Sequence, residues 1–434
     1  PENENLQLAL GNLYIENKNY AKANAIFESF DKEYGVNETS TLLSIKSLVA
    51  TGNYSAAKQK AEELLRQKPD DVMYNGLYAE VLSDANENEK ALGIYNKLLK
   101  SNPSDPNVQL SMADFLLKQK KYNDLFGILN TIVLNDAIRK EDKFQLFSGL
   151  IGNDDLVSDK ENRLSLALMV LEAAYKDDDN IPLLRADLMV KQGRLNDAAG
   201  RLEDIIKIRP VDYNAWLKLL LVYTDLKDWK TLTDKGAQCA SLFNMSLPAK
   251  LLYANGAMET GKYDVALEEL RKAEILAGNE KDFLSQVLTM RADVYYRQKN
   301  YDKAFETFDE ALRNNSNDLT VMNNYAYYLA EQNMNLKEAE SLAKKVVDKE
   351  KGNTTFLDTY GWVLYKRGKV NEAAKVFESI LKSSGQNDAE WFEHYGFILK
   401  KQHKCQKAVE YWEKAMELDN NKTHLKGEIQ SCGK

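Results

Sequence analysis

Apolar residues recur at intervals of three and four along most of the chain, in pairs of segments separated by a short polar break. The first pair covers "NLQLALGNLYIENKNYAKANAIFESF", and its break runs from Glu16 to Asn19. Similar breaks, each followed by a hydrophobic residue, return as "TGNY", "KQKKY", "KQGRL", "ETGKY", "RQKNY" and "KRGKV". This spacing is typical of amphipathic helices, so the pattern predicts helix-turn-helix pairs and an all-α fold.

A second regularity is a small or compact residue that returns at a nearly constant interval, 34 residues in the best-ordered stretches. It falls at Gly11, Ile45, Ala79, Ala113, Ala186, Leu220, Ala254, Ala292, Ala326, Gly361 and Gly396. A period of this length indicates stacked helical repeats, in which each repeat buries its apolar face against its neighbours. Proline is expected to end three of the second helices, at Pro69, Pro103 and Pro210.

These positions resemble the tetratricopeptide repeat family over most of the chain. The family signature combines a small residue and an aromatic residue in the first helix with an Ala and a large hydrophobic residue in the second. Two repeats fill these four positions with Gly11, Tyr14, Ala23 and Phe27, and with Ala292, Tyr295, Ala304 and Phe308. The resemblance implies a solenoid, a right-handed superhelix of about twelve helix-turn-helix repeats.

The repeat phase divides the chain into five segments. We expect repeats 1–4 in residues 1–139, a degenerate helical pair with an acidic connection in 140–178, repeats 6–8 in 179–280, repeats 9–12 in 281–422, and a capping helix in 423–434. The phase slips in 140–178 and again in 277–284, where an elongated turn is expected before Phe283. Either slip is a bend in the solenoid or a tolerated loop insertion.

The charge pattern and the hydropathy of the chain indicate which classes of partner to expect. The 58 basic and 66 acidic residues are interspersed and give a net charge of −8, without the basic stripe that a phosphate backbone requires. Nucleic acid is therefore not an expected partner. No run of 18 apolar residues is present, so no transmembrane segment is expected.

Candidate chemistry is sparse. A Gly-rich phosphate loop, HExxH, paired CxxC and GxSxG motifs are all missing from the sequence, so we expect a protein that is not an enzyme and has no cofactor. His403 and Cys405 carry donor types that zinc uses, but His403 falls in a turn and Cys405 occupies a position that Tyr20 and Tyr301 fill in other repeats. We therefore expect Cys405 to pack as a hydrophobic residue and the chain to hold no metal. Three cysteines are too few for a disulfide framework.

In the tetratricopeptide repeat family, the first helices line the concave surface, and the repeat phase identifies the residues expected there. Toward the C-terminus we expect a partner-binding groove built from Asn323, Asn324, Tyr327, Asp358, Trp362, Tyr365, His394 and Phe397. Aromatic rings and amide groups of this kind suit an extended peptide. The alternative is that the rings only pack between adjacent first helices. Toward the N-terminus the same positions form an apolar strip that includes Leu8, Leu42, Leu43, Gly76 and Leu77.

The expected function is that of a non-catalytic scaffold for a peptide or protein partner. The alternatives are an accessory or regulatory region of a larger enzyme or secretion or assembly machine, and a glycan-binding solenoid. The segments "NNYAYYLAEQNMNLKEAESLAKKVV" and "FLDTYGWVLYKRGKVNEAAKVFESIL" resemble the closing repeats of bacterial cell-envelope members of the family, including lipoproteins. This resemblance implies a periplasmic or outer-membrane-associated protein, with a lipid anchor before Pro1. A cytoplasmic location is the alternative.

Overall fold

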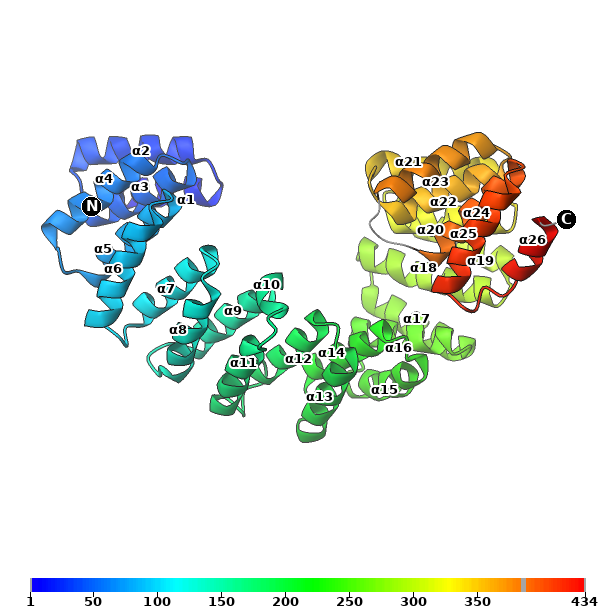
Figure 1. Ribbon diagram of the computed structural model, residues 1–434, viewed down its shortest axis with the longest axis horizontal. Coiled ribbons are helices and arrows are strands. Elements are labelled where there is room, and N and C mark those ends of the chain that lie inside the picture. Colours follow the sequence, from blue (N-terminus) through cyan, green and yellow to red (C-terminus); the bar gives the residue numbers. More distant parts are fainter. Residues whose placement is uncertain (1, 384–387, 433–434) are drawn as a thin grey trace. The chain divides into compact units, whose positions relative to one another are not determined.

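The computed structural model describes residues 2–383 and 388–432, and within these ranges it contains 26 α-helices and no strand. The expected all-α class is therefore confirmed. The chain divides into two compact units, residues 1–222 and 223–434, which we call the N-terminal half and the C-terminal half (Figure 1). The boundary between them falls inside α14 (Tyr213–Asp225).

The N-terminal half contains helix pairs that correspond to repeats 1–6. Its helices are α1 (Glu2–Glu16), α2 (Tyr20–Tyr34), α3 (Glu38–Ala50), α4 (Tyr54–Gln67), α5 (Val72–Asp84), α6 (Asn88–Ser101), α7 (Pro106–Lys118), α8 (Tyr122–Leu134), α9 (Lys140–Ile151), α10 (Asp154–Val157), α11 (Arg163–Ala174), α12 (Ile181–Lys191) and α13 (Leu195–Ile208). Repeat 7 begins with α14.

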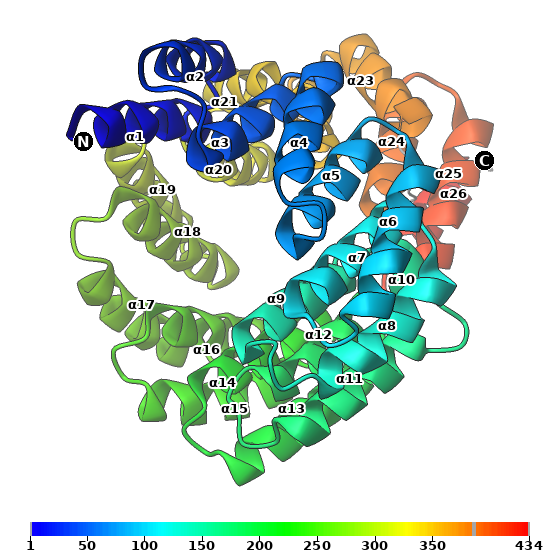
Figure 2. The same ribbon diagram turned by 90° about the vertical axis from the view of Figure 1, so that its left-hand side faces the viewer.

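The C-terminal half continues with the second helix of repeat 7 and runs to a short final helix. Its helices are α15 (Trp229–Leu242), α16 (Leu247–Glu259), α17 (Tyr263–Ala277), α18 (Lys281–Arg297), α19 (Tyr301–Asn314), α20 (Leu319–Glu331), α21 (Leu336–Lys349), α22 (Thr354–Lys366), α23 (Val370–Ser383), α24 (Ala389–Lys401), α25 (Cys405–Leu418) and α26 (Leu425–Cys432). The two helices of one repeat lie side by side, as α18 and α19 show in Figure 2.

One residue in each regular repeat has a left-handed backbone conformation, in the turn between the first and the second helix. It is the fifteenth residue of repeats that start at residues 4, 38, 72, 106, 179, 213, 247, 285, 319, 354 and 389, and its φ angle lies between +52° and +79°. The residues are Lys18, Gly52, Asn86, Lys120, Gly193, Lys227, Gly261, Lys299, Asn333, Gly368 and His403. Only glycine adopts this conformation without a steric penalty, so the turn geometry is set by position in the repeat and is imposed on the other residues.

The small residue of the first helix and the large residue of the second helix compensate for one another in size. A Cβ atom on Gly361 would lie 2.6 Å from the ring of Phe377, and Gly396 faces Trp412 with a similarly close approach. Both aromatic side chains are fully buried. Glycine in the first helix therefore makes room for a larger ring in repeats 11 and 12, which fixes the position of α22 and α24.

Three first helices that carry predicted site residues begin at a polar cap. The side chains of Asp318, Asn353 and Asp388 each accept hydrogen bonds from backbone N–H groups in the first turn of α20, α22 and α24. Such caps satisfy donors that the helix itself leaves unpaired and are each worth about 1 kcal/mol. The caps define the residue at which each helix starts. They therefore also determine which side chains of α20, α22 and α24 lie on the same face.

The fifth repeat is irregular. It consists of α9 and α11, which are connected by the four-residue helix α10 within the expected acidic stretch. Lys143 of α9 is completely buried, and its ammonium group donates to the carbonyl of Val133 at 2.9 Å and to the hydroxyl of Tyr175 at 3.0 Å. These bonds compensate for part of the free energy that burying a charge costs.

The second phase slip has a different form from the one expected. No elongated turn precedes Phe283, because Phe283 lies inside α18, which starts at Lys281 and is 17 residues long. Gly278, with a φ angle of +55°, ends α17, and Asp282 lies in the first turn of α18, where a carboxylate interacts favourably with the helix dipole. The extra residues therefore lengthen a first helix.

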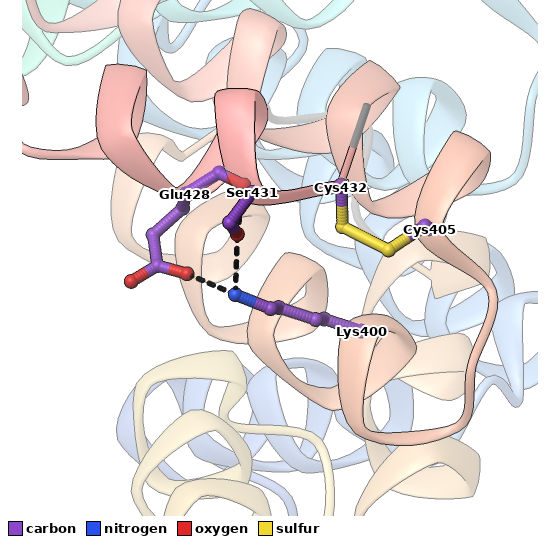
Figure 3. Close-up of a disulfide and its surroundings, with 5 residues drawn as sticks. All are labelled: Lys400, Cys405, Glu428, Ser431 and Cys432. Atoms are coloured by element: carbon purple, nitrogen blue, oxygen red, sulfur yellow. Dashed lines mark hydrogen bonds and ion pairs between the residues drawn. A yellow bond between two sulfur atoms is a disulfide. The ribbon is translucent and has the colours of Figure 1, made fainter. Parts of the chain in front are cut away.

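A disulfide holds the final helix. It joins Cys405, the first residue of α25, to Cys432, the last residue of α26 (Figure 3). Lys400 donates to Glu428 at 2.6 Å and to Ser431 at 2.7 Å, and Leu425 is fully buried against the last repeat. The expectation that Cys405 packs as a hydrophobic residue is wrong, because the fold of α26 brings a second thiol beside it.

Candidate partner-binding surfaces

The predicted groove residues of the C-terminal half lie on three consecutive first helices, α20, α22 and α24. Asn323, Asp358, Trp362 and His394 are buried, whereas the other four, Asn324, Tyr327, Tyr365 and Phe397, are half-buried. The accessible part of this surface is therefore smaller than the sequence suggested. We call it the C-terminal first-helix face.

Trp362 is the centre of an aromatic stack on this face. The centroid of its ring lies 4.0 Å from that of His394 and 5.0 Å from that of Tyr365, with interplanar angles of 14° and 17°. Phe397 contacts the stack at 6.1 Å. The indole N–H of Trp362 donates to Glu331 at 2.7 Å, so the polar atom of the ring already has a partner. Trp362 therefore joins three repeats and does not present a free ring.

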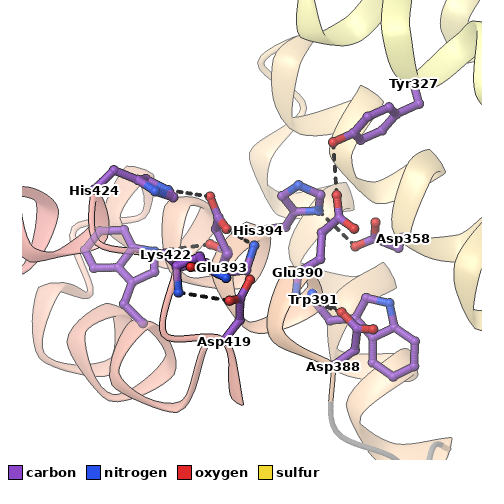
Figure 4. Close-up of polar contacts among 12 residues, drawn as sticks. Tyr327, Asp358, Asp388, Glu390, Trp391, Glu393, His394, Asp419, Lys422 and His424 are labelled. Carbon is purple, nitrogen blue, oxygen red and sulfur yellow. Dashed lines mark hydrogen bonds and ion pairs between the residues drawn. The ribbon is translucent and has the colours of Figure 1, made fainter. Parts of the chain in front are cut away.

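His394, a member of this stack, forms a buried pair with Asp358. The distance from Nδ1 of His394 to Oδ1 of Asp358 is 2.9 Å (Figure 4). Burial alone would lower the pKa of His394, but Asp358 and, more weakly, Glu390 and Glu393 outweigh burial and raise it above its ordinary value. The pair bonds repeat 11 to repeat 12 and is strongest when His394 is protonated.

Tyr327 lies at the edge of the same cluster. Its hydroxyl donates to Oε1 of Glu390 at 3.0 Å, and its ring is 6.5 Å from that of His394 (Figure 4). Burial and the nearby Glu390 raise the pKa of Tyr327, so the hydroxyl stays protonated and acts as a donor. Six of the eight predicted residues, all except the two asparagines, thus belong to one connected cluster.

Asn323 and Asn324 contact one another at one side of this cluster. The amide of Asn323 donates to Oδ1 of Asn324 at 3.4 Å, and Oδ1 of Asn323 has no hydrogen-bond partner among the described residues. A buried acceptor without a partner is unfavourable and is often satisfied by water or a ligand. The asparagines are the part of this face with unused hydrogen-bonding capacity.

The first helices of the N-terminal half form a more open surface. Three cavities of about 330, 340 and 200 Å³ lie along α3, α5 and α7 and share lining residues. Leu42 and Leu77 line the first two, and Glu80 lines all three. Leu42, Gly76 and Leu77 belong to the apolar strip expected from the sequence. We call this surface the N-terminal groove.

Glu80 is the polar centre of the N-terminal groove. Its carboxylate makes no hydrogen bond or ion pair with any residue in 2–383 or 388–432, whereas Asp114 nearby is paired with Lys118 at 3.0 Å. Desolvation raises the pKa of Glu80 and outweighs the lowering by Lys118, and Asp84 and Asp114 add smaller raising contributions. Glu80 is exposed to solvent, so its carboxylate is accessible to a donor from a partner.

The sequence analysis missed Glu80, together with Ser111 and the buried Tyr95, which line two of the cavities. Glu80 and Asp114 occupy the ninth position of their repeats, one of the positions that face inward in this kind of solenoid. That signal was present in the sequence. The hollow beside it was not, because it depends on how neighbouring side chains pack.

Metal-binding residues are not assembled in the described part of the chain. No group of three or more His, Cys, Asp or Glu side chains there is arranged to hold a metal ion. His403 occupies the left-handed turn position of repeat 12, and Cys405 is bonded to Cys432. None of the described helices has the length and apolar character needed to span a bilayer.

The chain is similar in sequence to known tetratricopeptide repeat proteins. Two tetratricopeptide repeat models match the chain, at residues 48–124 and 285–318. Tetratricopeptide repeat protein 21B of Xenopus laevis is 22% identical over 379 residues, and the match covers 77% of this chain and 28% of that protein.

Similar solved structures include a tetratricopeptide repeat protein from Parabacteroides merdae, with a TM-score of 0.49 and 17% identity over 59% of this chain and 99% of that one. Yeast Tom70 has a TM-score of 0.49 and 14% identity over 100% of this chain and 96% of its own.

Proposed function

Because this chain carries tetratricopeptide repeats, we propose that it is a non-catalytic scaffold that binds a peptide or protein partner along its first-helix faces. Arrays of helical repeats form extended concave surfaces, and proteins of this architecture use these surfaces to bind ligands. The fold alone does not identify the ligand, so the proposal depends on the chemistry of particular side chains.

The observation that supports this proposal best is the N-terminal groove. Its cavities follow three consecutive first helices, with leucine side chains on their walls and the unpaired carboxylate of Glu80 where they meet. Ligand sites are commonly concave and mainly apolar, with a few polar groups that fix orientation. A peptide with apolar side chains and a donor opposite Glu80 fits this description.

The side chains of the C-terminal first-helix face support binding over catalysis. His394 is buried against Trp362 and is already bonded to Asp358. A general base needs to reach the proton that it removes from a substrate. Here the imidazole joins two repeats instead.

A comparison of captured partners tests the proposal. The immobilised chain is incubated with extract of the organism that encodes it, and captured proteins are identified for the parent, for Leu77→Asp in the N-terminal groove, and for Leu134→Asp as a matched control. Leu134 is exposed on α8 and lines none of the three cavities. We expect Leu77→Asp alone to lose the partner, and because Leu77 also packs against the core, circular dichroism must first show that this variant is folded. Equal capture by both variants would contradict binding in this groove.

We further propose that the protein works in the cell envelope. The bond between Cys405 and Cys432 supports this location, because disulfides persist in oxidising compartments and are rare in the cytoplasm. Alkylation of intact cells before and after reduction measures whether the two thiols are free. Blocked thiols before reduction are expected, and free thiols would favour the cytoplasmic alternative.

A further inference from the structure

A cavity of about 600 Å³ lies in the C-terminal half, between α15, α16 and α17. It is lined mainly by the second helices of repeats 7 and 8, with Lys250 and Tyr253 of α16 between them. Counted from Leu247, the first residue of repeat 8, these two residues occupy positions four and seven, whereas the positions expected on the concave surface are two, five, six, nine, twelve and thirteen. The cavity therefore belongs to a different surface from the first-helix faces.

The bottom of this cavity carries a buried ion pair. Nζ of Lys250 lies 3.6 Å from Oε2 of Glu269, and the two side chains are only 7% and 9% exposed. Oε1 of Glu269 accepts a hydrogen bond of 2.7 Å from Lys272, but Oε2 accepts none from the described residues. Lys250 likewise donates no side-chain hydrogen bond there. The ammonium group of Lys250, a donor, and Oε2 of Glu269, an acceptor, thus lie side by side without a hydrogen bond.

This arrangement is energetically incomplete without a ligand. Burial of a charged group costs several kcal/mol, and an ion pair offsets this only when its remaining donors and acceptors are also satisfied. At 3.6 Å, the contact between Lys250 and Glu269 is too long to count as a hydrogen bond. A group that accepts from Lys250 and donates to Glu269 would complete both.

The remaining donor and acceptor select the kind of group that fits. The site holds the ammonium groups of Lys250 and Lys272 and the carboxylate of Glu269, and the group that completes it accepts from Lys250 and donates to Oε2 of Glu269. A peptide residue offers an acceptor and a donor without adding a charge. A residue in an extended peptide directs its N–H and its C=O to the same side, as paired strands show. Its carbonyl can accept from Lys250 while its N–H donates to Oε2 of Glu269.

The rim of the cavity suits the side chains of such a peptide. Met245 and Ile275 border it and are 76% and 68% exposed. An apolar side chain of the ligand would cover them. We propose that this cavity binds an extended, uncharged peptide segment of a partner protein, held by its backbone amide at Lys250 and Glu269 and by an apolar side chain at Met245 and Ile275.

Methyl NMR on the full chain tests the proposal with two probes, acetyl-Ala-Leu-Ala-amide and the same peptide N-methylated at Leu. The methyl signal of Met245 is assigned with Met245→Leu. The first probe is expected to shift it saturably, and the second, which lacks the N–H for Glu269, to bind at least tenfold more weakly. Equal binding of both probes, or no saturable shift, would overturn the proposal.

A double variant adds a second, independent measurement. Lys250→Met with Glu269→Gln keeps the side-chain lengths, removes both charges, and is expected to weaken the first probe at least tenfold. Lys207→Met with Asp204→Asn, an exposed pair at 3.1 Å, is the matched control and should bind as the parent does. Parent-like binding by the Lys250 and Glu269 variant overturns the proposal. If that variant does not fold, the proposal is tested by comparing the binding of the two probes to the parent protein.

Discussion

The hydroxyl of Tyr327 donates a hydrogen bond to Glu390, a residue 63 positions further along the chain. Tyr327 belongs to repeat 10 and Glu390 to repeat 12, so this bond passes across the first helix of repeat 11. Trp362 and His394 fill the space beside it. Three repeats of the C-terminal first-helix face are therefore connected through side chains, in addition to the packing of neighbouring helices.

Alanine at Tyr327 or Tyr365 is expected to weaken partner capture if this face binds a peptide. Both rings are half-buried, and a tyrosine anchor in an interface is typically worth about 2 kcal/mol or more. Titration of each variant with the captured partner measures the loss. Phe308→Ala is the core control, and it is expected to lose about 3–5 kcal/mol of stability.

Tyr327→Phe separates the ring from the hydroxyl. It removes only the bond to Glu390, so it should bind the partner nearly as the parent does if the ring is the anchor. If both alanine variants bind every captured partner as well as the parent, this face is not the site, and the N-terminal groove remains the better candidate.

Leucine at Ala304 or Ala373 should destabilise the protein. Both alanines are fully buried and lie on the second helix of their repeats, α19 and α23. Overpacking of such a position costs about 1–3 kcal/mol. Urea unfolding monitored by circular dichroism measures the change, with Ala25→Leu, an exposed position on α2, as the control. Unchanged unfolding of the two core variants would mean that the contact is looser than described.

Two glycines in repeat 6 should respond to alanine in opposite directions. Gly193 has a φ angle of +71°, whereas Gly200 lies inside α13, and neither would place a Cβ atom within 4 Å of another group. Gly193→Ala is expected to cost about 1–2 kcal/mol, because a side chain is strained in the left-handed conformation. Gly200→Ala is expected to stabilise the helix by about 0.5–1 kcal/mol. Thermal unfolding of both variants under identical conditions gives the comparison, and a shared sign would contradict it.

The pair of His394 and Asp358 should make stability depend on pH. The pKa of His394 is raised in the folded protein above the ordinary value of 6.5, so its contribution is fully present below that pH and is lost as the pH rises through the folded value. The melting temperature of the parent should therefore fall between pH 6 and pH 9 relative to that of His394→Gln. Parallel curves for the two proteins would show that the pair does not stabilise the charged imidazole.

Local sequence patterns account for the fold well and for the candidate surfaces in part. The small residue of the first helix, such as Ala292 or Gly361, and the polar turn after it recur at a regular interval. Residues close together in the sequence are therefore enough to predict each helix pair. The burial of Trp362 does not follow, because it depends on a histidine one repeat away that is itself held by Asp358. A repeat phase identifies which residues face inward, but not which of them bond to one another.

The disulfide and the cavities were beyond prediction for a related reason. Cys405 and Cys432 are 27 residues apart, and their pairing depends on the direction that α26 takes after α25. The N-terminal groove around Glu80 and the cavity at Lys250 each depend on the sizes of side chains from three helices. Both features come from tertiary packing, which a single sequence without its relatives specifies only weakly.

The bond between Cys405 and Cys432 also changes how the array would respond to mechanical tension. A pull applied at Cys432 passes through the sulfur atoms directly to Cys405, so α25 and α26 carry no load and cannot unravel first. The 27-residue span from Cys405 to Cys432 then adds nothing to the extended length, which shortens the chain at full extension by roughly 90 Å at about 3.4 Å per residue. With the bond intact, the first element of this end to feel the force is α24, where His394 and Glu390 hold repeat 12 to its neighbours.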